Sequence, residues 1–416
     1  MKRNRLFASH ALEPVPRRQT PSSPPRLFTS ITGASFAWIL LAGMLLASSI
    51  YGCVDPGPSK EIIYVGTFEG RDSEGIYVYE FDRKTGELTH IQTVTDRISP
   101  NFQTIHPNGQ LLYSVSREAF TDESESQTIG AYRIDRESGR LELINERPVG
   151  GVSPTYVSVD PDGRLAFVSH YITGNLSVFR ITEDGSLDGP TEVVQHEGSS
   201  IHPQRQQRPH AHSIVPSADG RFVYVQDLGI DRINIYETDY ENARLIPANV
   251  PAFESTPGAG PRHFVFHPDG EFAYLAEELT STVSVLQVDR RSGRLEQIQR
   301  ESLLPDDFEG ANSAADIHVS PDGRFLYASN RGHDSLAIYS INQTTGRITL
   351  EGHESTRGGH PRDFMIDKYG EFVLVANRDD DNVVVFRRDK STGMLEYTGR
   401  QVHVPMAVCV TQLILD

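Results

Sequence analysis

The sequence predicts an all-β protein, a seven-bladed β-propeller with four strands in each blade. A tight turn ending in Gly recurs six times, at intervals of 47 to 57 residues, at Gly109, Gly163, Gly220, Gly270, Gly323 and Gly370. Each turn is followed by a short apolar strand such as FLYASN, and then by another such as SLAIYSI. Short strands in this number, separated by turn residues, are typical of propeller blades. The apolar runs are too short and too rich in β-branched residues for helices.

The two ends of the chain supply the seventh blade. Residues 62–66, 75–79 and 86–90 match the second, third and fourth strands of a blade, with no first strand before them. Residues 407–414 match a first strand with nothing after it. If the C-terminal strand joins the N-terminal three, the ring closes and no sheet edge stays open. We therefore expect the propeller over residues 61–416, preceded by a linker at 53–60.

Residues 1–52 have the features of a targeting segment. Six basic residues in a long, Pro-containing stretch precede the apolar run 36–47, and small residues follow it. This layout predicts an export signal, or a membrane anchor if the whole segment 31–51 spans the bilayer. The residues Ile50–Cys53 resemble a bacterial lipobox, so Cys53 is a candidate for lipidation. We expect an exported protein, periplasmic or attached to a membrane. If the segment is not a signal, we expect a cytoplasmic one.

Charge and cysteine content narrow the possible partners. The formal net charge of −17 repels phosphate backbones, which argues against binding to nucleic acid. Only two cysteines are present, so no disulfide framework supports the chain, and Cys409 in an apolar segment is expected to be a small buried residue. We expect a monomer whose partner is a small molecule.

Polar residues cluster at the two ends of the inner hairpin of each blade. The turns, including His106 and His267, should lie on one face, where these histidines only form turns. The starts of the first strands and the ends of the second strands should meet on the other face. The candidates there are His210, His212, Asp227, Arg262, His263, Glu278, Asp316, His318, Arg331, His333, Arg362, Asp363 and Arg378. Arginines and histidines gathered at one rim suit an anionic substrate, for which Asp227, His263, Asp316, His318, His333 and Arg362 are the predicted binding residues.

Other interpretations of these residues stay open. His210 and His212, at alternate positions of one strand, could form a metal pair, but no Cys- or His-rich motif joins them. Without a metal, one could act as general base and the other as its support. Arg262 and Arg331 could instead form ion pairs with acidic residues across blades, namely Glu278 and Asp334. No serine-nucleophile, phosphate-loop or dinucleotide motif is present, so we expect neither a cofactor nor a metal.

From about Ile62 to Leu415 the chain resembles the seven-bladed lactonase family. This family includes metal-independent bacterial 6-phosphogluconolactonases and fungal carboxy-cis,cis-muconate lactonising enzymes. The resemblance is carried by segments such as PHAHSIVPSADGRFVYVQDLG, GPRHFVFHPDGEFAYLAEEL and SPDGRFLYASNRGHDSLAIY. Two residues depart from the family pattern, since Asp316 replaces a usual Glu and Glu277 replaces a common Asn.

The resemblance implies the hydrolysis of a sugar-type lactone in a central cleft. It places His210, His212, Arg262, Glu278 and Arg331 at the catalytic centre. His212 or His210 would be the general base, with Glu278 orienting it or sharing that role, and the two arginines would bind the substrate anion and the oxyanion. Cyclisation of a muconate is the nearest alternative activity. A non-catalytic exported binding propeller is a third possibility, because a fold does not determine a function.

Overall fold

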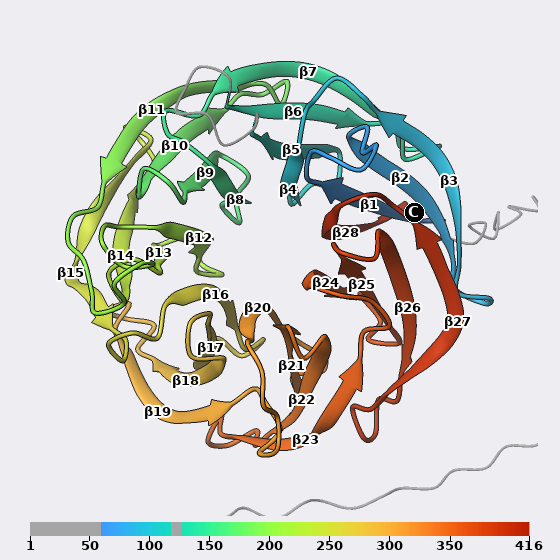
Figure 1. The fold of residues 1–416 in the computed structure, drawn as a ribbon. Coiled ribbons are helices and arrows are strands. Elements are labelled where there is room, and N and C mark those ends of the chain that lie inside the picture. Colours follow the sequence, from blue (N-terminus) through green and yellow to red (C-terminus); the bar gives the residue numbers. More distant parts are fainter. Residues whose placement is uncertain (1–59, 118–126, 416) are drawn as a thin grey trace, which may run out of the picture. The chain divides into compact units, whose positions relative to one another are not determined.

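The computed structural model describes residues 60–117 and 127–415, which form 28 β-strands and no helix. The strands make seven antiparallel sheets of four that follow one another around a ring (Figure 1). This part of the chain accordingly contains no helix long and apolar enough to cross a membrane. Residues 1–52 and Cys53 lie outside the described residues, so the export signal, the anchor and the lipidation stay predictions. The predicted all-β seven-bladed propeller is confirmed.

Within each blade the four strands follow one another from the centre of the ring outward. The blades are β28 (Ala407–Leu415), β1 (Lys60–Thr67), β2 (Ile76–Asp82) and β3 (Glu87–Val94); β4 (Pro100–Ile105), β5 (Leu111–Ser116), β6 (Thr128–Ile134) and β7 (Leu141–Pro148); β8 (Pro154–Val159), β9 (Leu165–His170), β10 (Asn175–Ile181) and β11 (Leu187–Gln195); β12 (Ala211–Pro216), β13 (Phe222–Asp227), β14 (Arg232–Asp239) and β15 (Arg244–Glu254); β16 (Pro261–Phe266), β17 (Phe272–Glu277), β18 (Thr282–Val288) and β19 (Leu295–Ser302); β20 (Ser313–Val319), β21 (Phe325–Arg331), β22 (Ser335–Ile341) and β23 (Ile348–Ser355); β24 (Pro361–Ile366), β25 (Phe372–Asn377), β26 (Asn382–Arg388) and β27 (Leu395–His403).

The ring closes as the sequence predicts. The C-terminal strand β28 pairs antiparallel with β1, from Lys60 opposite Leu415 to Gly66 opposite Cys409. Figure 1 shows this blade built from both ends of the colour scale. The closure leaves each inner strand between those of two neighbouring blades, so these seven strands surround the centre of the ring.

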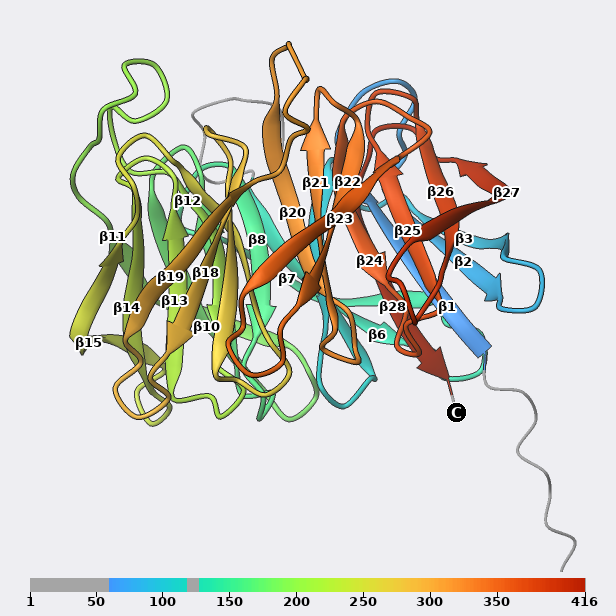
Figure 2. The ribbon, with the colours of Figure 1, turned by 90° about the horizontal axis from the view of Figure 1, so that it is seen from below.

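The second strands form the most deeply buried layer. Every residue of β5, β9, β13, β17 and β25 is buried. Seen edge-on, the blades stand side by side, so neighbours cover both faces of each sheet (Figure 2). A strand covered on both faces gains from apolar side chains at consecutive positions, which explains runs such as VVVF in β26. Cys409 is also buried, as predicted, with 2% of its surface exposed.

The histidines of the His-Pro-Asn/Asp-Gly turns join neighbouring blades. His106 Nε2 lies 3.0 Å from the carbonyl oxygen of Gly163, and His267 Nε2 lies 2.9 Å from that of Gly323. Gly163 has φ of +71°, and a Cβ there would come within 2.2 Å of the His106 ring, so only glycine fits. Both histidines are structural, in agreement with the sequence-based interpretation.

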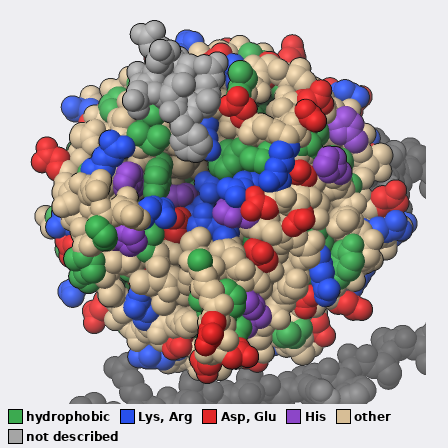
Figure 3. Space-filling view, viewed as in Figure 1, with side chains coloured by type: hydrophobic (Ala, Val, Ile, Leu, Met, Phe, Trp, Pro, Cys, Tyr) green, Lys and Arg blue, Asp and Glu red, His purple; other side chains and the backbone are tan. Residues whose placement is uncertain are grey.

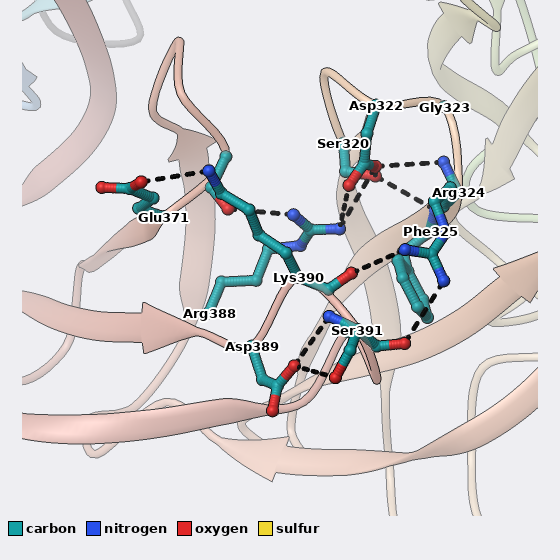
Figure 4. A network of polar contacts seen from close by, with 12 residues as sticks. Ser320, Asp322, Gly323, Arg324, Phe325, Glu371, Arg388, Asp389, Lys390 and Ser391 are labelled. Atoms are coloured by element: carbon teal, nitrogen blue, oxygen red, sulfur yellow. Dashed lines mark hydrogen bonds and ion pairs between the residues drawn. The ribbon is translucent and has the colours of Figure 1, made fainter.

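A buried arginine links two blades at the turns of their inner hairpins (Figure 4). Arg388, at the end of β26, is 3% exposed. Its guanidinium donates hydrogen bonds to Tyr327 Oη at 2.8 Å and to the Gly370 carbonyl at 2.9 Å, and it pairs with Asp322 Oδ2 at 3.2 Å. One side chain thus satisfies acceptors from β21, from the turn after β24 and from the turn after β20.

We expect Arg388→Leu to lower the free energy of unfolding by about 2–4 kcal/mol, because it removes a donor from a buried hydroxyl, a buried carbonyl and a half-exposed carboxylate. Urea unfolding followed by fluorescence measures the change. Arg387→Leu, which alters the exposed neighbour, is the control and should cost less than about 1 kcal/mol. Equal losses in the two variants would contradict a specific role for Arg388.

Candidate active site

A β-bulge occurs in the inner strand of every blade. In six strands one residue is skipped in the pairing register, and in β20 two residues are skipped. The skipped residues are Asn101, Thr155, His212, Arg262, Ala315, Asp316, Arg362 and Val408. A bulge re-aims a side chain that regular pairing would direct elsewhere, and bulges are frequent beside active sites. Thr155, His212 and Arg362 face a cavity at the centre of the ring.

A second repeated position lies at the end of each second strand. The residue there is Phe68, Arg117, Tyr171, Leu228, Glu278, Arg331 or Arg378, depending on the blade. Six of these seven line the same cavity, and the exception, Leu228, is buried. The second strands therefore direct six equivalent side chains into the cavity that three of the bulged residues also face.

The cavity has a volume of about 210 Å³ and is strongly cationic. Its lining is Phe68, Arg117, Ser153, Thr155, Tyr171, Arg205, His212, Glu278, Arg331, Arg362 and Arg378. Figure 3 shows Lys and Arg side chains gathered around the hollow at the centre of this face. Five arginines and one carboxylate form the wall, so the site attracts anions although the protein as a whole is acidic.

Glu278 is the only carboxylate of this wall and is bound by three guanidinium groups. Arg262 Nε and Arg331 Nη2 each lie 2.9 Å from Oε2, and Arg205 Nη2 lies 2.5 Å from Oε1. Burial alone would raise the pKa of Glu278, but Arg331, Arg262 and Arg205 together hold it well below its usual range. The carboxylate is therefore ionised and a poor base, and it holds the arginines in place.

His212 is a neutral imidazole at the edge of the cavity. Burial, together with the charge of Arg262 and the neighbouring His263, lowers its pKa well below the ordinary value. The residue is 3% exposed, and its Nδ1 is buried with no hydrogen-bond partner among the described residues. A histidine that stays unprotonated at neutral pH can accept a proton from a substrate or a water molecule.

The positive charge of the Arg362 guanidinium is not balanced by an ion pair with any described residue. Arg362 makes no hydrogen bond or ion pair with any residue of the described ranges. Its carbon Cζ lies 4.8 Å from the centre of the Phe68 ring, which Arg117 also approaches, at 4.1 Å. Burial and the nearby charges of Arg262, Arg331 and Arg117 lower its pKa well below the usual value, so an incoming anion would relieve an unfavourable concentration of positive charge.

The structure brings most predicted catalytic residues together. His212, Glu278 and Arg331 line the cavity, and Arg262 lies behind it, bonded to Glu278 and to the Ala315 carbonyl at 2.6 Å. The ion pair of Arg262 with Glu278 is present, and Arg331 also pairs with Glu278, whereas Asp334 accepts hydrogen bonds from the backbone N–H groups of Gly332 and His360. The ion pairs therefore coexist with the cavity rather than replacing it.

Three predicted residues support the cavity from outside. His210 stacks on Tyr171 with ring centres 4.5 Å apart and donates from Nδ1 to the Tyr171 carbonyl at 2.6 Å. His263 packs against His212 with ring centres 5.2 Å apart. Asp227 is fully buried and accepts a hydrogen bond from the His210 backbone N–H at 2.7 Å, so it orders the backbone.

Asp316 and His318, expected on the rim with His212, line a different cavity. This cavity has a volume of about 400 Å³ and is also lined by Asp363 and by residues near the turn ends of the inner strands. In β20 Asp316 is the second of the two bulged residues and His318 follows it, so both lie deeper along the axis than Ala315, the first bulged residue. His333 is also absent from the cationic cavity; its Nδ1 lies 2.6 Å from Ser335 Oγ and its ring contacts Phe308.

Arg205 is the main functional residue that the sequence did not reveal. It lies in the segment 196–210 between β11 and β12, whose backbone is anchored by the buried Gln206 through a 2.8 Å bond from Nε2 to the Leu228 carbonyl. Arg205 also donates to Tyr171 Oη at 2.9 Å. Arg205 lies in a loop, so the repeated strand pattern could not identify it. Arg117, Tyr171 and Phe68 were equally missed, although they occupy the same repeated position as Glu278.

Comparisons with known proteins agree with this architecture. The family model described as "Lactonase, 7-bladed beta-propeller" matches residues 62–412. The 6-phosphogluconolactonase of Bacillus subtilis is 36% identical over 310 residues, covering 74% of this chain and 86% of that protein. The 6-phosphogluconolactonase of Formosa agariphila is 39% identical over 312 residues, covering 73% and 86%.

A solved structure shows the same arrangement. The periplasmic gluconolactonase of Pseudomonas aeruginosa superposes with a TM-score of 0.82 at 35% identity, covering 86% of this chain and all of that one. The match of the family model, the identity of the curated relatives and the seven-bladed ring all lead to one assignment. The chain belongs to the seven-bladed β-propeller lactonase family.

Proposed function

We propose that this protein hydrolyses a sugar-type lactone that carries an anionic group, as 6-phosphogluconolactonases do, and that it does so without a metal. The observation that carries the proposal is a neutral imidazole, His212, in the same cavity as the uncompensated guanidinium of Arg362. Within the described residues, no group of three or more His, Cys, Asp or Glu side chains is placed to hold a metal ion. The side chains of the cavity supply acid–base and electrostatic chemistry.

In the proposed reaction, His212 removes a proton from a water molecule whose oxygen forms a bond to the lactone carbonyl carbon. The carbonyl oxygen becomes an oxyanion, which Arg331 and Arg205 stabilise at the cavity wall. The ring C–O bond then breaks, and the leaving oxygen takes the proton back from His212. The product is a hydroxy acid. Arg262 contributes through Glu278, because its guanidinium is buried behind the cavity.

A panel of lactones tests the proposal. The purified protein should open 6-phosphogluconolactone or another anionic δ-lactone much faster than buffer does, and a chelator should not change the rate. Cyclisation of 3-carboxy-cis,cis-muconate without lactone turnover would assign the alternative activity instead. Absence of both reactions would support a binding propeller without catalysis.

We expect Arg362→Gln to raise KM for an anionic lactone by about 10- to 100-fold, because it removes one charge-assisted interaction worth about 1.5–3 kcal/mol. KM for neutral glucono-δ-lactone should not change. Arg378→Gln is the matched control, since Arg378 lines the same cavity but already pairs with Asp379 at 2.7 Å. A change in KM of equal size for the neutral lactone would show that Arg362 does not recognise the anion.

We also propose that the protein is exported. The charge and hydropathy of residues 1–52 support this, as does the periplasmic location named for the Pseudomonas aeruginosa relative. Cell fractionation with mass analysis of the mature N-terminus tests it. A periplasmic enzyme would meet few phosphorylated sugars, so an exported form predicts a sugar lactone whose anion is a carboxylate.

A further inference from the structure

A chain of buried polar side chains continues from His212 away from the cleft. His212, His263 and Asp316 come from the inner strands β12, β16 and β20 of three successive blades. The His212 and His263 rings meet edge to face, with centres 5.2 Å apart and planes at 65°. His263 Nδ1 then lies 2.7 Å from Asp316 Oδ1. None of the three residues is more than 5% exposed.

The geometry determines the protonation of His263. Asp316 accepts at Oδ1 from His263 and at Oδ2 from His318 Nε2, which is also 2.7 Å away. His318 and His263 hold the pKa of Asp316 well below its usual range against the effect of burial, so it is a carboxylate. Burial, with Arg262 nearby, lowers the pKa of His263 to about 4. His263 is thus a neutral ring with its proton on Nδ1.

The His263 ring, which packs behind His212, is fixed in one orientation. It also makes edge-to-face contacts with Tyr156, at 5.4 Å, and with Phe102, at 6.1 Å, and these two rings stack on each other at 4.1 Å. The hydrogen bond to Asp316 removes the remaining rotation. His212 therefore rests against a rigid imidazole whose far side carries a negative charge.

We propose that Asp316, acting through His263, is a positioning residue for the base His212, and that its charge stabilises the imidazolium formed when His212 takes a proton. The inference rests on the proposed function of His212. Glu278 is the other nearby carboxylate, but three arginines already neutralise it. Asp316 is the carboxylate that reaches His263 on this side of the cavity, and it shares its charge with His318, whose pKa it raises.

Other charged and titratable groups surround the two residues. Those near His212 are Tyr171, Arg262, His263, Glu278, Arg331 and Arg362. Those near Asp316 are Tyr156, Arg262, His263, His318, Asp363 and Cys409. The arginines oppose protonation of His212. Glu278 is already shared by three arginines, so loss of the Asp316 charge would further disfavour a protonated His212.

Asp363 offers a matched control. It follows the bulged residue of β24, as His263 follows that of β16, and it is buried near Asp316. Burial and the charge of Asp316 raise its pKa well above the usual value, which favours the protonated acid. The same carboxyl-to-amide change at Asp363 therefore alters a neighbouring buried carboxyl that makes no hydrogen bond with His263.

The test compares Asp316→Asn, Asp316→Glu and Asp363→Asn on an anionic lactone. Asp316→Asn should lower kcat roughly tenfold with KM unchanged, and it should move the acid limb of kcat/KM to lower pH, because the base becomes weaker. Asp316→Glu, which keeps the charge, and Asp363→Asn should both behave as wild type. Wild-type kcat and pH profile in Asp316→Asn, or an equal loss in Asp363→Asn, would overturn the proposal.

Two further measurements keep the test decisive. If Asp316→Asn does not fold, His263→Gln interrupts the same connection, and a wild-type pH profile in that variant overturns the proposal. If the wild type opens no lactone, the function proposed for His212 fails separately. An NMR titration of the His212 ring then decides, since its midpoint should be lower in Asp316→Asn than in wild type, and identical midpoints contradict the inference.

Discussion

Replacing His212 with alanine should lower kcat for lactone opening by about 10²- to 10⁴-fold, the usual contribution of a general base. The imidazole is the neutral proton acceptor of the cavity, whereas Glu278 is ionised but held by three arginines. The wild-type enzyme should keep its activity well below pH 6.5, because the lowered pKa of His212 keeps the ring unprotonated there. Steady-state rates from pH 4 to 9 measure both effects.

His210→Ala is the control for this variant. The His210 ring already donates to the Tyr171 carbonyl and stacks on the Tyr171 ring, so its loss should disturb the cavity wall and cost no more than about tenfold. The assignment of the base would be wrong if His210→Ala lost as much activity as His212→Ala, or if the acid limb of wild type centred at or above pH 6.5.

Replacing Glu278 with glutamine should harm both stability and activity. The amide keeps the shape of the side chain but removes the charge that Arg205, Arg262 and Arg331 share. Breaking a buried ion pair by removing one partner costs about 3–5 kcal/mol, since the remaining charges stay buried. We expect a loss of that size in the free energy of unfolding and at least a 100-fold loss in kcat/KM. Urea unfolding and lactone kinetics measure the two effects.

Glu277→Gln separates the effect on stability from the effect on activity. Glu277 precedes Glu278, is fully buried and pairs with Arg300 at 2.7 Å, but it does not line the cavity. Its replacement should therefore destabilise the blade while kcat/KM stays within a few-fold of wild type. If both variants lost activity in parallel, the effect of Glu278 would reflect folding rather than the arrangement of the arginines.

Much of the architecture could be predicted from local patterns. The turns at about 50-residue intervals, the apolar strands after them and the incomplete blades at the two ends predicted the seven-bladed ring and its closure. The same repeat predicted that Glu278, Arg331 and His212 face one rim. It could also have identified Arg117 and Tyr171, which occupy the position of Glu278 in other blades.

The depth of a residue along the central axis could not be predicted. Asp316 is the second bulged residue of β20 and His318 lies just after it, yet both line another cavity. The reason is the bulge, which shifts the register by one or two residues and so changes which side chains reach the cleft. A bulge in a strand leaves no clear mark in the order of apolar and polar residues.

The amino-acid sequence by itself determined the fold, the closure of the ring and the family, because strand and turn preferences are local and are repeated blade after blade. Only the tertiary structure decided which charges remain uncompensated. Arg262 and Arg331 share Glu278 with Arg205 from a loop, while Arg362 makes no hydrogen bond or ion pair with the described residues. Charge balance and pKa depend on distances of a few ångströms between distant segments, and those distances exist only once the blades have packed around a common centre.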